Sequence, residues 1–182
     1  MITEQTERVN KTTSVPASQV GTVVAVCMRK EKGVPKYPQT EVTIGEYGVE
    51  GDYHSGPMRT RSNGNVEPNR RHVTLVAKEV FDDLNRELST DIPAGGFGEN
   101  ILVEGLGDLS DIKEGDVLAF SSGVELEVTG QNDPCKNLMV YHNQVPKRAY
   151  GRRGLLTIVR STGRLKPGDS ITVRSSTGSA AQ

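Results

Sequence analysis

The sequence predicts a mainly β protein, a β-barrel or sandwich of about eight short strands with one or two helices. Short β-branched and aliphatic runs recur along the chain, as expected of strands that bury at least one face. Glycine and proline clusters separate these runs, and the chain has 20 Gly and 9 Pro in all. Residues 77–88 are the one segment with clear helical periodicity.

Three strands are predicted in the first half of the chain. Residues 21–27 are apolar and β-branched but too short for an ordinary helix, so they predict a buried strand in which Cys27 is a core thiol. Residues 41–44 alternate and lead into a glycine-rich turn at 45–51, and residues 72–76 predict a third strand. Residues 52–71 are predicted to be a long polar loop, and loops of that length commonly bind a ligand or are disordered.

The helix at 77–88 carries its apolar residues on one face. These are Val80, Phe81, Leu84 and Leu88. Charged side chains occupy the opposite face, which is typical of a helix that packs against a sheet.

The second half predicts five more strands. They cover residues 100–103, 117–120, 124–128, 155–159 and 170–173, with a glycine-rich turn at 95–98 and a hairpin turn at 121–123. The segments 112–118 and 165–171 share a Gly-Asp step ahead of a strand, so Asp116 and Asp169 are interpreted as turn residues rather than catalytic ones.

Length and composition limit the function classes. With 182 residues and a mass of 19.7 kDa, one domain is expected over residues 20–174, flanked by flexible polar tails at 1–19 and 175–182. A formal charge of −1 and the absence of Trp argue against nucleic-acid binding. No apolar run is long enough for a membrane span or a secretion signal. Two cysteines fit a reducing compartment, so a cytoplasmic location is predicted.

Cys135 is the leading candidate for chemistry. It opens the stretch 134–153, which contains five cations and no Asp or Glu. Asp133 is the predicted N-cap of a helix and Pro134 its first residue, which would put Cys135 in a first turn where the helix dipole and nearby cations favour the thiolate. Such a thiolate serves as a nucleophile or a soft-metal ligand. The alternative is a small buried hydrophobe, the commonest state of a free cysteine.

Basic residues are concentrated in two segments, 59–71 and 136–153, as expected of loops that surround one binding site for a phosphate or another oxyanion. Three roles are open for His54: a ligand, a base, or a polar residue whose hydrogen bonds are satisfied within the fold. His72 and His142 are interpreted as structural. The chain lacks the P-loop, the Rossmann glycine fingerprint, HExxH and GxSxG. A papain-like catalytic Cys–His pair is a further alternative, because the two residues of such a pair are close in space and not in sequence.

Several motifs, taken in order, resemble the MOSC family, the domain named for the C-terminus of molybdenum cofactor sulfurases. They are Lys36 in a proline-flanked loop, the segment 48–54 (GVEGDYH), 97–101 (FGENI), Gly115-Asp116, 133–135 (DPC) and 163–169. The resemblance covers about residues 20–173. It implies a MOSC-like β-barrel that binds the molybdenum cofactor (molybdopterin), a pterin dithiolene with a phosphate.

The resemblance also assigns roles to residues of this sequence. Cys135 matches the family's cysteine, a sulfur acceptor or molybdenum ligand, and is the expected catalytic and metal-binding residue. Cofactor-binding positions that match family motifs are Lys36, Asp52, His54 and Asn100. Charge alone adds Arg71, Lys136, Arg152 and Arg153 as phosphate contacts.

Three functions remain open. The first is a stand-alone molybdenum-cofactor protein that reduces small N-hydroxylated compounds, with electrons from a separate donor because two separated cysteines cannot hold an iron–sulfur cluster. The second is a non-redox persulfide or cofactor carrier supplied by a cysteine desulfurase. Full-length sulfurases of the family carry a pyridoxal-phosphate desulfurase domain. This chain has neither the length nor an obvious site for one, so no pyridoxal phosphate is expected on it. The third is a non-catalytic module that binds a pterin or another anion.

Overall fold

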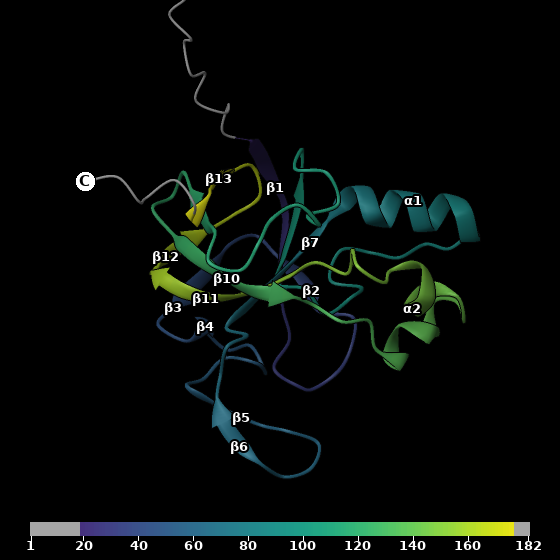
Figure 1. The fold of residues 1–182 in the computed structure, drawn as a ribbon, viewed down its shortest axis with the longest axis horizontal. Helices are drawn as coiled ribbons and strands as arrows, with labels where there is room; N and C mark the ends of the chain where they lie inside the picture. The colour runs from purple at the N-terminus through teal and green to yellow at the C-terminus, as the bar shows by residue number, and fades with distance from the viewer. Residues whose placement is uncertain (1–18, 177–182) are drawn as a thin grey trace, which may run out of the picture.

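A computed structural model describes residues 19–176, and its centre is a closed β-barrel (Figure 1). The barrel strands are β1 (Val20–Met28), β7 (Val73–Ala77), β8 (Ile101–Glu104), β9 (Val117–Phe120), β10 (Glu125–Gln131), β11 (Leu155–Ser161) and β13 (Ser170–Arg174). They pair in the order β13-β9-β10-β11-β7-β8-β1, and a further β1–β13 pairing closes the ring. A short strand β2 (Tyr37–Gln39) adds to β1. The mainly β barrel predicted from sequence is confirmed.

The helix α1 (Lys78–Leu88) connects β7 to β8, the one parallel pair of the barrel. It buries Val80, Phe81 and Leu84 against the sheet, as its periodicity predicted. The ring of Phe81 packs edge-on against Phe97 at a centroid distance of 4.7 Å. The helix therefore supports the glycine-rich loop at residues 95–98.

A single apolar core fills the barrel, with Leu118, Leu126 and Ile171 fully buried on neighbouring strands. Cys27 lies in this core with 0% exposure, and burial raises the pKa of its thiol to about 12. The prediction that Cys27 is a core residue is confirmed, and this thiol stays protonated at neutral pH.

Two smaller sheets lie outside the barrel. The strands β3 (Val42–Gly45), β4 (Gly48–Val49) and β12 (Gly163–Leu165) form one of them. The strands β5 (Met58–Thr60) and β6 (Val66–Pro68) form a hairpin, here called the hairpin arm, which projects from the barrel (Figure 1). The prediction of an unbroken loop over residues 52–71 is therefore wrong, because the middle of that segment pairs with itself.

The two Gly-Asp turns have the structural role predicted for them. The carboxylate of Asp116 accepts a hydrogen bond from the backbone N–H of Lys113, and that of Asp169 accepts one from Lys166. In both turns the side chain closes the step that starts the next strand.

The segment after β10 folds into a 3₁₀ helix η1 (Lys136–Val140) and a short α2 (Val145–Arg148). The predicted helix start is wrong in detail: Cys135 is the N-cap, and no side chain caps the helix. The backbone carbonyl of Asp133 instead accepts a hydrogen bond from Arg153. A tertiary contact, and not helix capping, thus holds the turn that presents Cys135.

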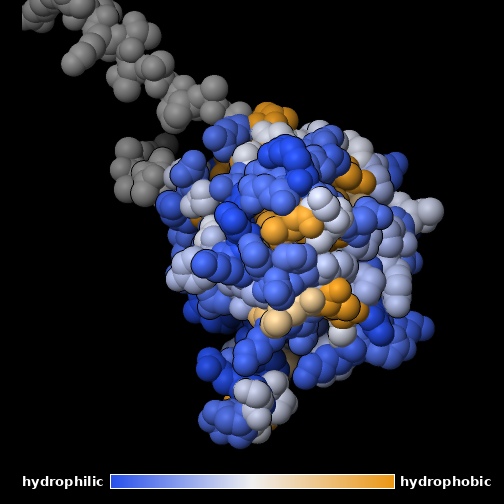
Figure 2. All heavy atoms as spheres, turned by 90° about the vertical axis from the view of Figure 1, so that its right-hand side faces the viewer, coloured by the Kyte–Doolittle hydropathy of each residue, from blue (hydrophilic) through white to orange (hydrophobic). Residues whose placement is uncertain are grey.

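The face that carries α1 and α2 is mostly hydrophilic, with small separate hydrophobic groups (Figure 2). Between residues 19 and 176 no helix is both long and apolar enough to cross a membrane. The tails predicted at 1–19 and 175–182 fall almost entirely outside the described residues.

Candidate functional site

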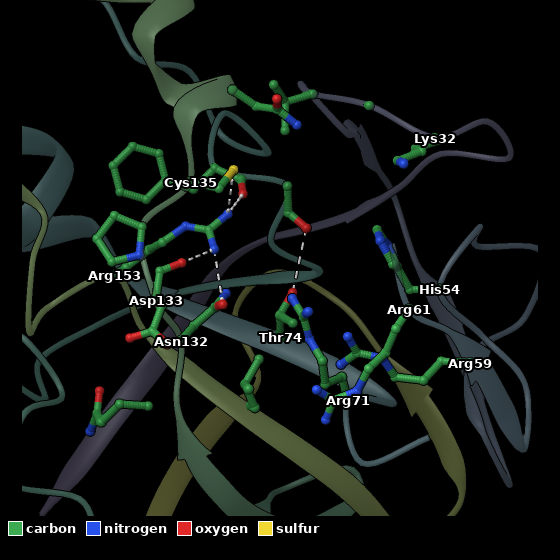
Figure 3. A pocket seen from close by; sticks show the side chains of 18 residues that line it. Lys32, His54, Arg59, Arg61, Arg71, Thr74, Asn132, Asp133, Cys135 and Arg153 are labelled. Atoms are coloured by element: carbon green, nitrogen blue, oxygen red, sulfur yellow. Dashed lines mark hydrogen bonds between the residues drawn. The ribbon is translucent and has the colours of Figure 1, made fainter. Parts of the chain in front are cut away.

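A cavity of about 480 Å³ opens beside Cys135 at one end of the barrel (Figure 3). Six parts of the chain build it: the loop at residues 32–34, the hairpin arm with residues near its base, β7, the 95–98 loop, the turn between β10 and η1, and the start of β11. Its charged and polar lining includes Lys32, His54, Arg59, Arg61, Arg71, Thr74, Asn132, Asp133, Cys135 and Arg153. Five cations therefore face one carboxylate.

Cys135 is half-buried, and its Sγ lies 4.0 Å from a terminal guanidinium nitrogen, Nη2, of Arg153. The sulfur therefore lies beside a fixed positive charge at the cavity. Among the described residues no group of three or more His, Cys, Asp or Glu side chains could hold a metal ion. Of the two cysteines, Cys135 lines the cavity and Cys27 does not.

Arg153 is only 7% exposed and organises this wall of the cavity. Its guanidinium donates to Asn132 Oδ1 at 2.9 Å, to the Asp133 carbonyl, and to the Phe97 carbonyl at 3.1 Å. Burial lowers the pKa of Arg153, and the charge of Cys135 opposes that shift. Its Nε is buried without a hydrogen-bond partner. A buried cation with a free donor is a natural contact for an anion.

Arg71 lies on the opposite wall, close to Arg59 and Arg61 (Figure 3). Burial and then the positive charges of Arg59 and Arg153 lower the pKa of Arg71. Arg59 and Arg61 both pair with Glu67, at 3.4 and 2.7 Å. The buried Nε of Arg71 has no hydrogen-bond partner. The positive charge of this wall is therefore only partly balanced.

Behind the cavity lies a buried ion pair. Lys36 Nζ contacts Asp52 Oδ2 at 2.8 Å, and both side chains are at most 2% exposed. The same Asp52 carboxylate accepts hydrogen bonds from the backbone N–H groups of Arg29 and His54. Burial alone would raise the pKa of Asp52, but hydrogen bonds from His54 and the charge of Lys36 outweigh it, so the pKa falls below its usual value. The pair anchors the loop that carries His54 to the cavity.

Two neighbouring buried polar residues brace the structure around the cavity: Asn100 joins β1 to β7, and Glu99 holds the loop at residues 95–98. The Asn100 amide donates to the Cys27 carbonyl and accepts a hydrogen bond from the Thr74 N–H. The Glu99 carboxylate accepts the N–H groups of Gly95 and Phe97. Since the Phe97 carbonyl accepts from Arg153, this buried carboxylate fixes one of the hydrogen bonds that position the cation beside Cys135.

Comparison with known proteins identifies the family of this chain. Residues 50–172 match the family model described as the MOSC domain. The chain belongs to the MOSC domain family. It is 32% identical over 149 residues to YuaD of Bacillus subtilis (strain 168), a protein whose name links it to metal-sulfur cluster biosynthesis. That match covers 70% of this chain and 77% of YuaD.

Solved structures share the MOSC fold. The crystal structure of YuaD from Bacillus subtilis superposes with a TM-score of 0.78 at 24% identity, covering 86% of this chain and 96% of that one. YiiM from Geobacillus stearothermophilus has a TM-score of 0.66 at 21% identity, with 85% and 75% of the two chains covered. YiiM from Escherichia coli gives 0.59 at 20%, with 87% and 69% covered.

The cavity beside Cys135 brings together only some of the site residues predicted from sequence. Those that line it are Cys135, His54, Arg71 and Arg153. Those that lie buried behind it are Lys36, Asp52 and Asn100. Lys136 and Arg152 are not among its lining residues, and Arg152 pairs with Asp83 of α1 at 3.2 Å. Their cationic charge alone could not show which way they point.

Sequence reasoning did not single out Lys32, Thr74, Asn132 and Glu99. The first three carry no motif signal and reach the cavity only through the fold. Glu99 did offer a signal, because it is an acid between a glycine-rich turn and an apolar strand, where a solvated side chain is unexpected.

Proposed function

We propose that this MOSC protein binds the molybdenum cofactor in the cavity, with Cys135 as the protein's sulfur ligand to molybdenum. The observation that carries the proposal is the position of the Cys135 sulfur, half-buried at the cavity and 4.0 Å from the buried Arg153 guanidinium. A thiolate is a soft ligand of the kind that suits a metal already held by the sulfurs of a dithiolene.

The residues present fit the cofactor. Its phosphate and pterin need hydrogen-bond donors, and Arg71 and Arg153 each have a buried Nε with no partner among the described residues. The cavity of about 480 Å³ lies within the ~300–1,000 Å³ range of small-molecule sites. Arg153 would stabilise the Cys135 thiolate, and Arg71 would hold an anionic group on the opposite wall.

The reaction we propose is the reduction of an N-hydroxylated compound to the parent amine or imine and water. It consumes two electrons and two protons and breaks the N–O bond. The bound cofactor would supply the two-electron chemistry, while His54 at the cavity offers a proton-carrying side chain near the substrate. A separate donor must deliver the electrons, because Cys27 is sealed in the core and one accessible cysteine cannot hold an iron–sulfur cluster.

The proposal is tested by producing the protein in a host that makes the cofactor and measuring molybdenum by mass spectrometry. Cys135→Ser should abolish N-reductive activity with an artificial electron donor and lower the molybdenum content. Cys27→Ala, at the second cysteine, is the matched control and should keep both. Full metal and activity in Cys135→Ser would exclude the proposed role.

A second function, persulfide transfer on Cys135, is favoured by the name of YuaD, which refers to metal-sulfur cluster biosynthesis. Here a cysteine desulfurase would pass a sulfane sulfur to the Cys135 thiolate. Incubation with a desulfurase and ³⁵S-cysteine should label wild-type protein and not Cys135→Ser. Absence of ³⁵S label on the wild-type protein would exclude the persulfide-carrier function. Tight pterin-phosphate binding with neither molybdenum nor label would favour the non-catalytic module instead.

A further inference from the structure

A second cavity, of about 430 Å³, lies under the hairpin arm and adjoins the first. The two cavities share the lining residues Lys32, His54, Arg59 and Arg71. Cys135 and Arg153 line only the first, while Tyr53 and Met58 line only the second. The site therefore has a thiol compartment and an arm compartment, with a row of cations where they meet.

The arm compartment is cationic. Lys32, Arg59 and Arg71 line it, and its lining contains no Asp or Glu. Glu67, the carboxylate partner of Arg59, is outside this lining and makes its shorter contact with Arg61. A ligand that fills the compartment gains most if it carries a negative group at the cationic end.

The rest of the lining combines polar side chains with two large side chains that offer apolar surface. Tyr53 is 49% exposed and Met58 is 52% exposed, and both are large side chains left facing an opening. The Tyr53 ring stands edge-on to the His54 ring at 5.1 Å between centroids. Aromatic rings and a thioether bind planar aromatic groups well, through stacking and sulfur–ring contacts.

A buried side chain fixes the shape of the compartment. Asn69 is 6% exposed, and its amide donates to the carbonyls of His54 and Gly56 at 2.9 and 2.8 Å. Its Oδ1 accepts the N–H of Arg71 at 3.0 Å. One residue thus ties the base of the hairpin arm both to the His54 loop and to Arg71 in the connection that leads to β7.

We propose that the arm compartment binds the substrate, and that this substrate is a small planar aromatic compound with a phosphate or carboxylate group. The inference rests on the proposed function, since it assigns the thiol compartment to the cofactor. The cofactor itself has a flat heterocycle and a phosphate, so the substrate and the cofactor share the chemistry that this compartment recognises. Loading the protein with cofactor distinguishes the two, because a substrate site in the arm compartment still binds its ligand after loading.

The test uses 1-naphthyl phosphate as the probe, with 1-naphthol and inorganic phosphate as its two halves. Isothermal titration is run on metal-free and molybdenum-loaded protein. The naphthyl phosphate should bind both forms with similar affinity, and each half should bind at least about tenfold more weakly, as expected when ring stacking and charge both contribute.

Variants localise the binding. Tyr53→Ala, at a residue that lines only the arm compartment, should weaken naphthyl phosphate binding about tenfold without changing molybdenum content. Arg59→Gln, at the row of cations shared by the two compartments, should weaken naphthyl phosphate binding about tenfold in the metal-free protein. Tyr150→Ala and Arg164→Gln are matched controls at exposed positions outside both cavities, and they should bind normally.

Two results would overturn the inference. Loss of naphthyl phosphate binding on molybdenum loading would assign the arm compartment to the cofactor. Equal binding of inorganic phosphate and naphthyl phosphate would reduce the compartment to an anion site. A protein that never takes up molybdenum would instead contradict the proposed function, and the titration of the metal-free form would still report on the compartment.

Discussion

Replacing Lys36 by methionine should destabilise the protein strongly, although methionine matches the lysine stem in length. Lys36 is 2% exposed and its ammonium lies 2.8 Å from the equally buried Asp52 carboxylate. Lys36→Met leaves that carboxylate charged and without its cation. Removing one partner of a buried pair costs about 3–5 kcal/mol, a large share of the roughly 5–15 kcal/mol of a typical domain.

Urea unfolding measures this loss as a fall of roughly 2 M in the midpoint, for a slope of about 2 kcal/mol per molar. The matched control is Lys78→Met, which breaks an exposed pair with Asp82 at 2.6 Å and should cost under about 1 kcal/mol. Asp52→Asn added to Lys36→Met should recover part of the loss, because it removes the buried unpaired charge.

The pH dependence of the same pair has a definite sign. The pKa of Asp52 is lower in the folded protein than in the unfolded chain, so its stabilisation is present above the unfolded value of about 3.9 and is lost as pH falls. The gap in unfolding free energy between wild type and Lys36→Met should therefore narrow in acid. A loss no larger than that of Lys78→Met, or a gap unchanged in acid, would refute the reasoning.

Burial raises the pKa of Glu99 to about 7 against the backbone hydrogen bonds that lower it, so the folded protein holds this proton more tightly than the unfolded chain. The free energy of unfolding should therefore fall by up to about 3 kcal/mol as pH rises from about 4.5 to about 7. Urea unfolding of Glu99→Gln at several pH values should lack this pH dependence. Gly154→Ala should lower the melting temperature by several degrees at least, because φ is +106° and a Cβ would lie 1.9 Å from the Leu75 carbonyl oxygen. Iodoacetamide should alkylate Cys135 but not Cys27 in the folded protein, as read by mass spectrometry. Alkylation of both would contradict the burial of the Cys27 thiol.

The elements that sequence predicted well are those whose signal is local. The strand expected at residues 21–27 corresponds to β1 (Val20–Met28), and the helix expected at 77–88 corresponds to α1 (Lys78–Leu88). In both, the pattern of apolar residues reports directly which face is buried. The hairpin arm escaped prediction because its strands are short and mostly exposed, so no apolar alternation marks them.

The site shows the limit of the same reasoning. Cys135 and Arg153 were predicted from an acid-free stretch, and the fold places them side by side. Lys36 and Asp52 look like loop residues in sequence, and only their meeting across the fold makes their burial possible. Closure of the barrel by β1 with β13 is likewise a contact between chain ends that no local pattern encodes.

The central claim, that the Cys135 sulfur binds molybdenum, is tested most directly by X-ray absorption at the molybdenum edge of the loaded protein. Wild type should show one more sulfur neighbour than Cys135→Ser, and Cys27→Ala should match wild type. Identical sulfur shells in wild type and Cys135→Ser would contradict the account.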